Sequence, residues 1–207
     1  MSSRRSVPPA LRAAATAAGV IAAAYFAAYV AIRPLPAAAQ PAGGDPLAAF
    51  EVLRSVLQHP RCQNCHIPGD APLQYDEGLR HAQYVMRGPT GHGAVAMECS
   101  TCHRDANAPA SYGDRSPPGA PDWHLPPPQT KMVFIGLSPR QLCETVKDRQ
   151  ATGGKDLQAM LAHVRDDKLV AWGWEPGGTR ARPPVSRADT VAAMKAWIDA
   201  GAPCPAA

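Results

Sequence analysis

Two cysteine pairs, each followed directly by a histidine, are the residues of this chain whose types and spacing predict chemistry. The motif residues are Cys62, Cys65, His66, Cys99, Cys102 and His103. This C-x-x-C-H spacing is typical of haem c attachment, in which two thiols bond to the vinyl groups of one porphyrin and the histidine reaches the iron. The sequence therefore predicts two covalently bound c-type haems, with His66 and His103 as proximal iron ligands.

A structural zinc site is the first alternative, because two C-x-x-C pairs could supply four thiolates to one ion. The pairs are separated by 33 residues, whereas about 15–20 residues are typical of a zinc ribbon. With 7 histidines in 207 residues, a histidine directly after both pairs is also unexpected by chance. The spacing therefore favours haem over zinc, and over disulfides within the pairs.

Two cysteines remain outside the motifs, Cys143 and Cys204. In an oxidising compartment, an even remainder predicts a disulfide bond. Two separate buried thiols are the alternative.

The second axial ligand of each iron is expected among the other histidines. His81 and His92 lie between the two motifs, where the chain crosses from one haem to the next. His124 stands beside Leu125 and two prolines, whose rigidity could hold an imidazole in place. We expect His81 and His124 to be the distal ligands, with His92 as an alternative.

Three further side chains have donor atoms that could bind iron. Met132 lies in a proline-preceded run, residues 128–134, that resembles the methionine-ligand loop of single-haem cytochromes c. It is a second alternative distal ligand, although it could equally pack in the core. His59 lies three residues before Cys62 and is a poor distal ligand for its own haem. His163 is expected in a helix, where it caps the helix or covers a surface.

The N-terminal segment predicts export. Three arginines precede an uncharged run of 20 residues, 13–32, and small residues follow up to Ala39. Residues 1–39 are therefore expected to be a signal peptide cleaved near Ala39 or an uncleaved membrane anchor. Both readings place the remaining chain in the periplasm. Residues 40–44 are a linker, and residues 45–207 are expected to form one dihaem domain.

The charge of the chain bears on whether it binds nucleic acid. The full sequence has 21 basic and 17 acidic residues. Residues 1–39 hold four of the basic and none of the acidic ones, so 17 of each sign remain. A neutral domain gives no support for binding nucleic acid.

The expected fold is mostly α with extensive proline-rich coil, in which short helices pack around two covalently bound haems. Caps and hydrophobic spacing predict four helices, at residues 45–59, 138–149, 155–166 and 186–200. In the first helix, the apolar positions expected to face inward are Leu47, Phe50, Leu53, Val56 and Leu57. Little periodicity appears over residues 68–97, and residues 107–129 carry seven prolines.

The region after residue 44 resembles a group of small bacterial dihaem cytochromes c of the isoquinoline 1-oxidoreductase type. The segments that carry the resemblance are residues 59–62, 87–93, 123–127 and 172–174. A looser similarity exists to the dihaem subunit of periplasmic nitrate reductase, in which histidines near the motifs give bis-histidine ligation. The resemblance implies redox partner proteins, among which a molybdenum hydroxylase on another polypeptide is one candidate.

Together these features favour an electron-transfer protein that relays electrons from a partner oxidoreductase, and not an enzyme in its own right. A haem enzyme with one open iron position, such as a peroxidase or reductase, is the main alternative. A haem-bearing structural or sensor subunit of a membrane complex is another, with anchoring through residues 13–32.

Overall fold

The computed structural model describes residues 44–113 and 115–206 of the chain. The predicted signal peptide or anchor, residues 1–39, and all but the last residue of the linker lie outside these ranges. Within the described ranges, no helix has the length and apolar character needed to cross a membrane.

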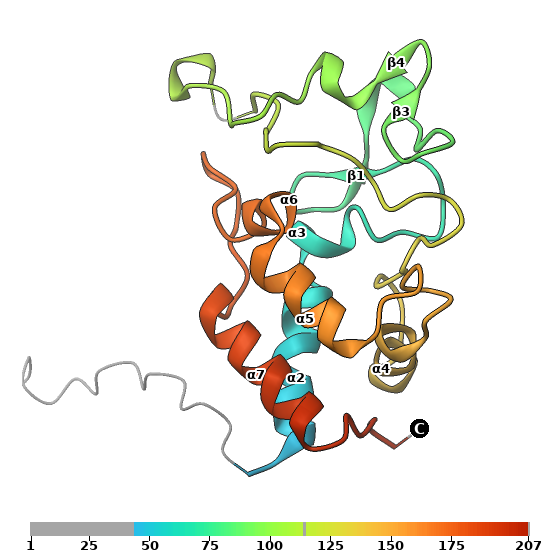
Figure 1. The fold of residues 1–207 in the computed structure, drawn as a ribbon. Coiled ribbons are helices and arrows are strands. Elements are labelled where there is room, and N and C mark those ends of the chain that lie inside the picture. The colour runs from blue at the N-terminus through green and yellow to red at the C-terminus, as the bar shows by residue number, and fades with distance from the viewer. Residues whose placement is uncertain (1–43, 114, 207) are drawn as a thin grey trace, which may run out of the picture. The chain divides into compact units, whose positions relative to one another are not determined.

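The described residues are mostly α-helical, as predicted, with long irregular connections between the helices (Figure 1). The α-helices are α2 (Pro46–Leu57), α3 (Pro60–Gln63), α4 (Pro139–Lys147), α5 (Leu157–Asp166), α6 (Lys168–Trp172) and α7 (Arg187–Asp199). Prolines are frequent in the connections, where they prevent a helix from continuing.

Local sequence explains where the four longer helices begin. Asp45 caps α2 by accepting a hydrogen bond from the backbone N–H of Leu47, and Pro46 occupies the first turn, where its missing N–H costs nothing. Ser138 and Gln141 form a reciprocal capping box at the start of α4. Asp156 and Ser186 cap α5 and α7 in the same way as Asp45. These starts confirm the four predicted helices.

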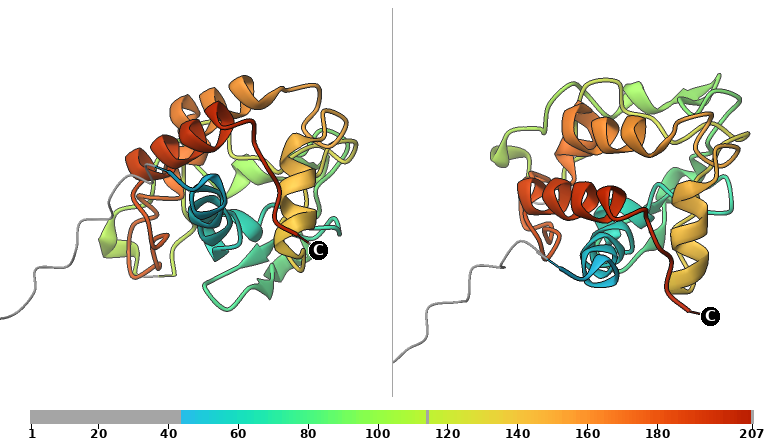
Figure 2. Two further views of the ribbon diagram at one scale, coloured as in Figure 1. Left: turned by 90° about the horizontal axis from the view of Figure 1, so that it is seen from below. Right: turned by 60° about the horizontal axis from the view of Figure 1, so that its bottom comes forward.

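The hydrophobic core lies where α2 and α7 run side by side, with α5 against α7 (Figures 1 and 2). Phe50 of α2 and Trp197 of α7 are fully buried, and their ring centroids lie 5.4 Å apart. The indole N–H of Trp197 donates to the carbonyl of Pro203 at 2.9 Å, so the buried polar atom is satisfied.

A disulfide bond joins Cys143 of α4 to Cys204, which confirms the predicted pairing. It closes a loop with a sequence separation of 61 residues. The segment that follows α7 passes beside α4 and carries Cys204 with it (Figure 2). The bond therefore links the segment after α7 covalently to α4.

One expected core residue is exposed. The side chain of Leu47 is 42% exposed, while Phe50, Leu53 and Val56 are buried. At about 100° per residue, Leu47 points roughly 180° away from Val56 on the same helix. Its apolar character therefore does not place it on the buried face.

Two elements and four very short strands were not predicted. Helices α3 and α6 have four and five residues, too few to show a helical period. Strand β1 (Leu73–Gln74) pairs antiparallel with β2 (Leu79–Arg80), and β3 (Gly93–Ala94) pairs antiparallel with β4 (Met97–Glu98). Two-residue strands leave no readable alternation in a sequence.

Candidate functional site

Helix α3 and the turn after it carry the first C-x-x-C-H motif. Cys62 lies in α3, and the backbone N–H groups of Cys65 and His66 both donate to the carbonyl of Cys62 at 3.2 Å. This tight turn holds the two thiols and the imidazole in one short piece of chain. Such a compact arrangement is what attachment to a single porphyrin requires.

The imidazole of His66 is oriented by a hydrogen bond at Nδ1 and by stacking on Phe134. Its Nδ1 lies 2.8 Å from the backbone carbonyl of Met132, to which it donates. The ring stacks on Phe134 with centroids 4.0 Å apart, and the Phe134 N–H donates to the carbonyl of His66 at 2.9 Å. With Nδ1 engaged, Nε2 is the atom left to bind a metal, because a ligating histidine usually donates its other nitrogen to such an acceptor.

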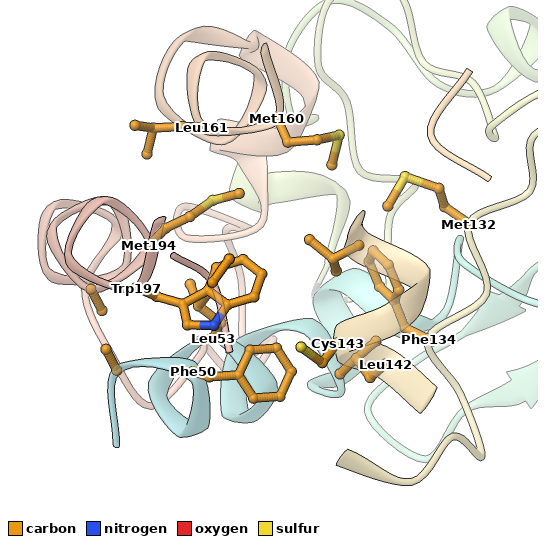
Figure 3. Packing of buried hydrophobic residues seen from close by; sticks show 14 residues of the cluster. Phe50, Leu53, Met132, Phe134, Leu142, Cys143, Met160, Leu161, Met194 and Trp197 are labelled. Carbon is orange, nitrogen blue, oxygen red and sulfur yellow. The ribbon is translucent and has the colours of Figure 1, made fainter. Parts of the chain in front are cut away.

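A large apolar hollow opens in front of this motif. It encloses about 1400 Å³, including space open to solvent, and Cys62, Cys65 and His66 line it. Its other walls include Leu53, Val56, Trp123, Met160, Trp172 and Met194. Met160 reaches into this region from α5, and Met132 reaches toward it from the facing loop (Figure 3). A flat apolar group of porphyrin size suits such a hollow.

The buried surroundings alter the acid-base properties of the first motif. Burial raises the pKa of the Cys62 thiol to about 12 and that of Cys65 to about 11. Burial also lowers the pKa of His66 to about 4. The motif therefore presents neutral thiols and a neutral imidazole, and a neutral imidazole is the form that binds a metal.

The second motif follows the β3–β4 hairpin. Cys99 opens a short 3-10 turn, and its N–H donates to the carbonyl of His92 at 2.9 Å. The N–H groups of Cys102 and His103 return to the Cys99 carbonyl at 3.1 and 2.9 Å. Cys102 is exposed. The second motif thus repeats the tight turn of the first on a more open part of the chain.

His103 and His81 face each other at the second motif. Nδ1 of His103 donates to the Pro118 carbonyl at 2.7 Å, and Nδ1 of His81 lies 2.8 Å from the Ala82 carbonyl. Both rings therefore keep Nε2 free, and their centroids are 6.2 Å apart. Two imidazoles bound to one metal through bonds of about 2.0–2.1 Å would have centroids about 6 Å apart. The centroid separation of the pair is thus close to that of two imidazoles bound to one metal.

Trp123 connects the two motifs. Its indole stacks on His103 with centroids 4.4 Å apart and planes within 1° of parallel. It also contacts Trp172 edge-on at 4.8 Å, and both indoles line the hollow of the first motif. One aromatic ring thus separates His103 from the first hollow.

The other expected distal ligands occupy different positions. The rings of His92 and His124 stack on each other, 4.9 Å apart, and both approach the carboxylate of Asp122. His124 also lines the first hollow, whereas His92 is exposed. The backbone carbonyl of Met132 lies behind His66, and Met132 also lines the first hollow. The structure therefore brings His81 to a motif histidine and groups His92 with His124.

His163 was not expected to be a ligand, but it lies at the first site. It lies in α5, lines the first hollow, and has its Nδ1 3.4 Å from the carboxylate of Asp167. Burial lowers its pKa. Met160, one turn earlier in α5, lines the same hollow. The four-residue spacing of His163 and Asp167 on a predicted helix was a signal that could have suggested an oriented imidazole.

Arg61 places a cation at the edge of the first hollow. Its side chain is buried, forms an ion pair with Asp76 and lies with Cζ 5.9 Å from the Trp172 ring centroid. Its Nε has no hydrogen-bond partner among the described residues. A buried, unsatisfied N–H at the hollow suits a carboxylate such as a haem propionate.

The four motif cysteines do not form a zinc-like cluster. In residues 44–113 and 115–206, the only group with the mutual spacing of metal ligands is His92, Asp122 and His124. The geometry therefore favours two separate sites, one at each motif.

The chain was compared with known proteins. No protein-family model, curated protein or solved structure matched it. The chemistry of the two motifs rests on the residues and contacts of the chain itself.

Proposed function

We propose that this chain is a dihaem c-type cytochrome that transfers electrons in the periplasm. One repeated observation carries the proposal. At each motif a histidine donates Nδ1–H to a backbone carbonyl, Met132 or Pro118, and keeps Nε2 free beside two cysteines. This second contact fixes the tautomer and orientation of an axial haem ligand.

A haem bound at either motif would supply an iron that accepts one electron and passes it on. The residues of the chain would hold and tune it. Cys62 and Cys65 would bond covalently to the first haem, and Cys99 and Cys102 to the second. The apolar walls of the first hollow would exclude water, and Arg61 would pair with a propionate.

His81 is the proposed distal ligand at the second motif, in agreement with the 6.2 Å separation of its ring from that of His103. Both imidazoles are oriented by backbone carbonyls. Closure of both axial positions favours electron transfer over reaction with a bound substrate, because the iron then has no vacant site.

His163 is the proposed distal ligand at the first motif. It lines the hollow together with His66, and the Asp167 carboxylate lies beside its Nδ1, an arrangement typical of ligating histidines. His124 lines the same hollow, but its ring is stacked on that of the exposed His92. Met160 offers a thioether one turn from His163 and is the alternative ligand.

The second motif is the proposed point of electron exchange with partners. Cys102 is exposed, and large exposed apolar side chains lie on the segments around the motif. They are Leu79, Tyr84, Val95 and Met97. Part of this apolar surface would contact the haem, and the rest would surround its edge. The proposed partners are redox proteins, of which a molybdenum hydroxylase is a candidate.

The proposal is tested on protein produced in a host that attaches haem c. The intact mass should correspond to the chain plus two haems, and it also reports whether residues 1–39 are removed. Ferrous spectra should be low-spin and unchanged by carbon monoxide. A single haem, bound zinc in place of haem, or a carbon monoxide adduct of the native protein would contradict a dihaem carrier.

A further inference from the structure

Outside the two motifs, three side chains converge at the surface. Nε2 of His92 lies 3.0 Å from Oδ1 of Asp122, and Nδ1 of His124 lies 3.5 Å from Oδ2 of the same carboxylate. One possible ligand atom from each residue lies within 4.8 Å of those of the other two. We propose that His92, Asp122 and His124 form a binding site for a divalent transition-metal ion, with zinc as the best match.

The cluster is built by two loops that are fastened to each other. The N–H of Leu125 donates to the carbonyl of Gly91 at 2.9 Å. A Cβ on Gly91 would lie only 2.0 Å from the Leu125 carbonyl oxygen, and its φ is +95°, so glycine is required for this approach. Residues 92 and 124 each adjoin this contact, which brings their rings into a stack.

The orientation of His92 is set before any ion binds. The hydroxyl of Thr90 lies 3.2 Å from Nδ1 of His92, which directs Nε2 toward Asp122. This is the outer contact that metal-binding histidines usually have. For His124, Nδ1 donates to the backbone carbonyl of Asp122 at 2.6 Å, and an ion at this nitrogen would replace that hydrogen bond.

The donor set selects the kind of ion. Two imidazole nitrogens and one carboxylate oxygen suit zinc, copper or nickel better than magnesium or calcium, which prefer oxygen ligands alone. Ligands of a tetrahedral zinc with bonds of about 2.0–2.1 Å lie a little over 3 Å from one another. The 3.0 and 3.5 Å separations are close to this spacing. Because the side chains of His92 and Asp122 are exposed, water can complete the coordination.

An ion at this cluster would fasten the surroundings of the second motif. The carbonyl of His92 accepts the N–H of Cys99, and Asp122 directly precedes the Trp123 ring that stacks on His103. Joining His92 to Asp122 therefore links the segment before the motif to the ring behind its histidine. The site itself uses no cysteine and does not depend on the proposed haems.

The test is binding of zinc chloride to the haem-loaded protein, by calorimetry and by metal analysis after dialysis. We expect one zinc per chain. His92→Ala and Asp122→Asn should each weaken binding at least about tenfold, because each removes a ligand. Zinc should also raise the melting temperature of the native protein and not that of the Asp122→Asn variant.

Asp166→Asn is the matched control, since Asp166 is an exposed carboxylate whose partner in the structure is Arg165. Its zinc binding should equal that of the native protein. Unchanged haem absorption in each variant shows that the fold is retained. Absence of zinc from the native protein, or equal affinity in the native protein and in both cluster variants, overturns the site.

Discussion

The same five-residue pattern occurs twice in this chain, and the two copies lie in different surroundings. The first is enclosed by α2, α5 and α7 around an apolar hollow, and burial raises the pKa of both of its thiols. The second lies among short hairpins and turns, where burial raises the pKa of Cys99 but Cys102 is exposed. The motif thus specifies what can bind, whereas the surrounding elements decide how deeply it is buried.

Because the two sites differ in burial, we expect the proposed haems to have different roles. A haem enclosed by helices is shielded from solvent, while one near the surface can exchange electrons with a partner. Trp123 stands between them, stacked on His103 and lining the first hollow. If both motifs hold haem as proposed, Trp123 would lie on the path of an electron from the second site to the first.

The largest expected difference between the sites is in folding. The double variant Cys62→Ala, Cys65→Ala should fail to accumulate as folded protein, because the apolar hollow lined by α2, α5 and α7 would lose the group proposed to fill it. Cys99→Ala with Cys102→Ala should give a folded protein with one haem. Circular dichroism and intact mass measure both outcomes. Equal tolerance of the two double variants would show that the first site is not part of the core.

The disulfide should stabilise the helical side of the molecule. Replacing Cys143 and Cys204 with serine removes a bond that closes a loop of 61 residues, and loop entropy predicts a loss of about 4 kcal/mol in the free energy of unfolding. Denaturant titration measures this loss. The absorption of the second haem should be unchanged in the folded variant. A change confined to the second haem would contradict the assignment of the bond to the helical side.

The distal ligands separate the sites by spectroscopy. His81→Ala should open the second iron to carbon monoxide, and His163→Ala should open the first, because each removes one of two axial imidazoles. Met160→Leu is the matched control, and it should leave both irons closed. If Met160→Leu opens the first iron and His163→Ala does not, the ligand is the thioether. Asp167→Asn should have a smaller effect, because it leaves the His163 imidazole in place and asparagine can still cap α6.

The smallest expected effect is on reduction potential. With similar ligands, the buried first haem should have the higher potential, because burial disfavours the additional positive charge of the ferric iron. A spectroscopic redox titration should resolve two one-electron steps more than about 59 mV apart, a tenfold difference in equilibrium constant. The protein with only the first haem assigns the steps. A lower potential at the first site would reverse the comparison.

Several features could be predicted because they depend on neighbours in the chain. Asp45 followed by Pro46, and Ser138 followed by Gln141, identify helix starts that the structure confirms. The pairing of Cys143 with Cys204 follows from an even remainder of cysteines. Helix α3 and the paired strands escaped prediction because two to four residues carry no readable period.

The roles of the remaining histidines could not be predicted, because spacing along the chain does not determine distance between loops. The sequence predicted that His163 caps a helix or covers a surface, whereas in the structure it lines the first hollow. His124 was expected to be a distal ligand, with His92 as an alternative. The backbone contact between Gly91 and Leu125 instead brings both histidines to one carboxylate. Only His81, among the expected ligands, lies opposite a motif histidine.

By itself, the sequence determined the two C-x-x-C-H motifs, the caps of the longer helices and the disulfide partners. The motifs and the caps are patterns of neighbouring residues. The disulfide follows from a count, because only two cysteines lie outside the motifs. Only the tertiary structure decided that one motif is enclosed and the other is open, and which histidines meet. Those properties depend on the packing of distant segments, where burial and contact arise from the whole core and not from any single stretch of chain.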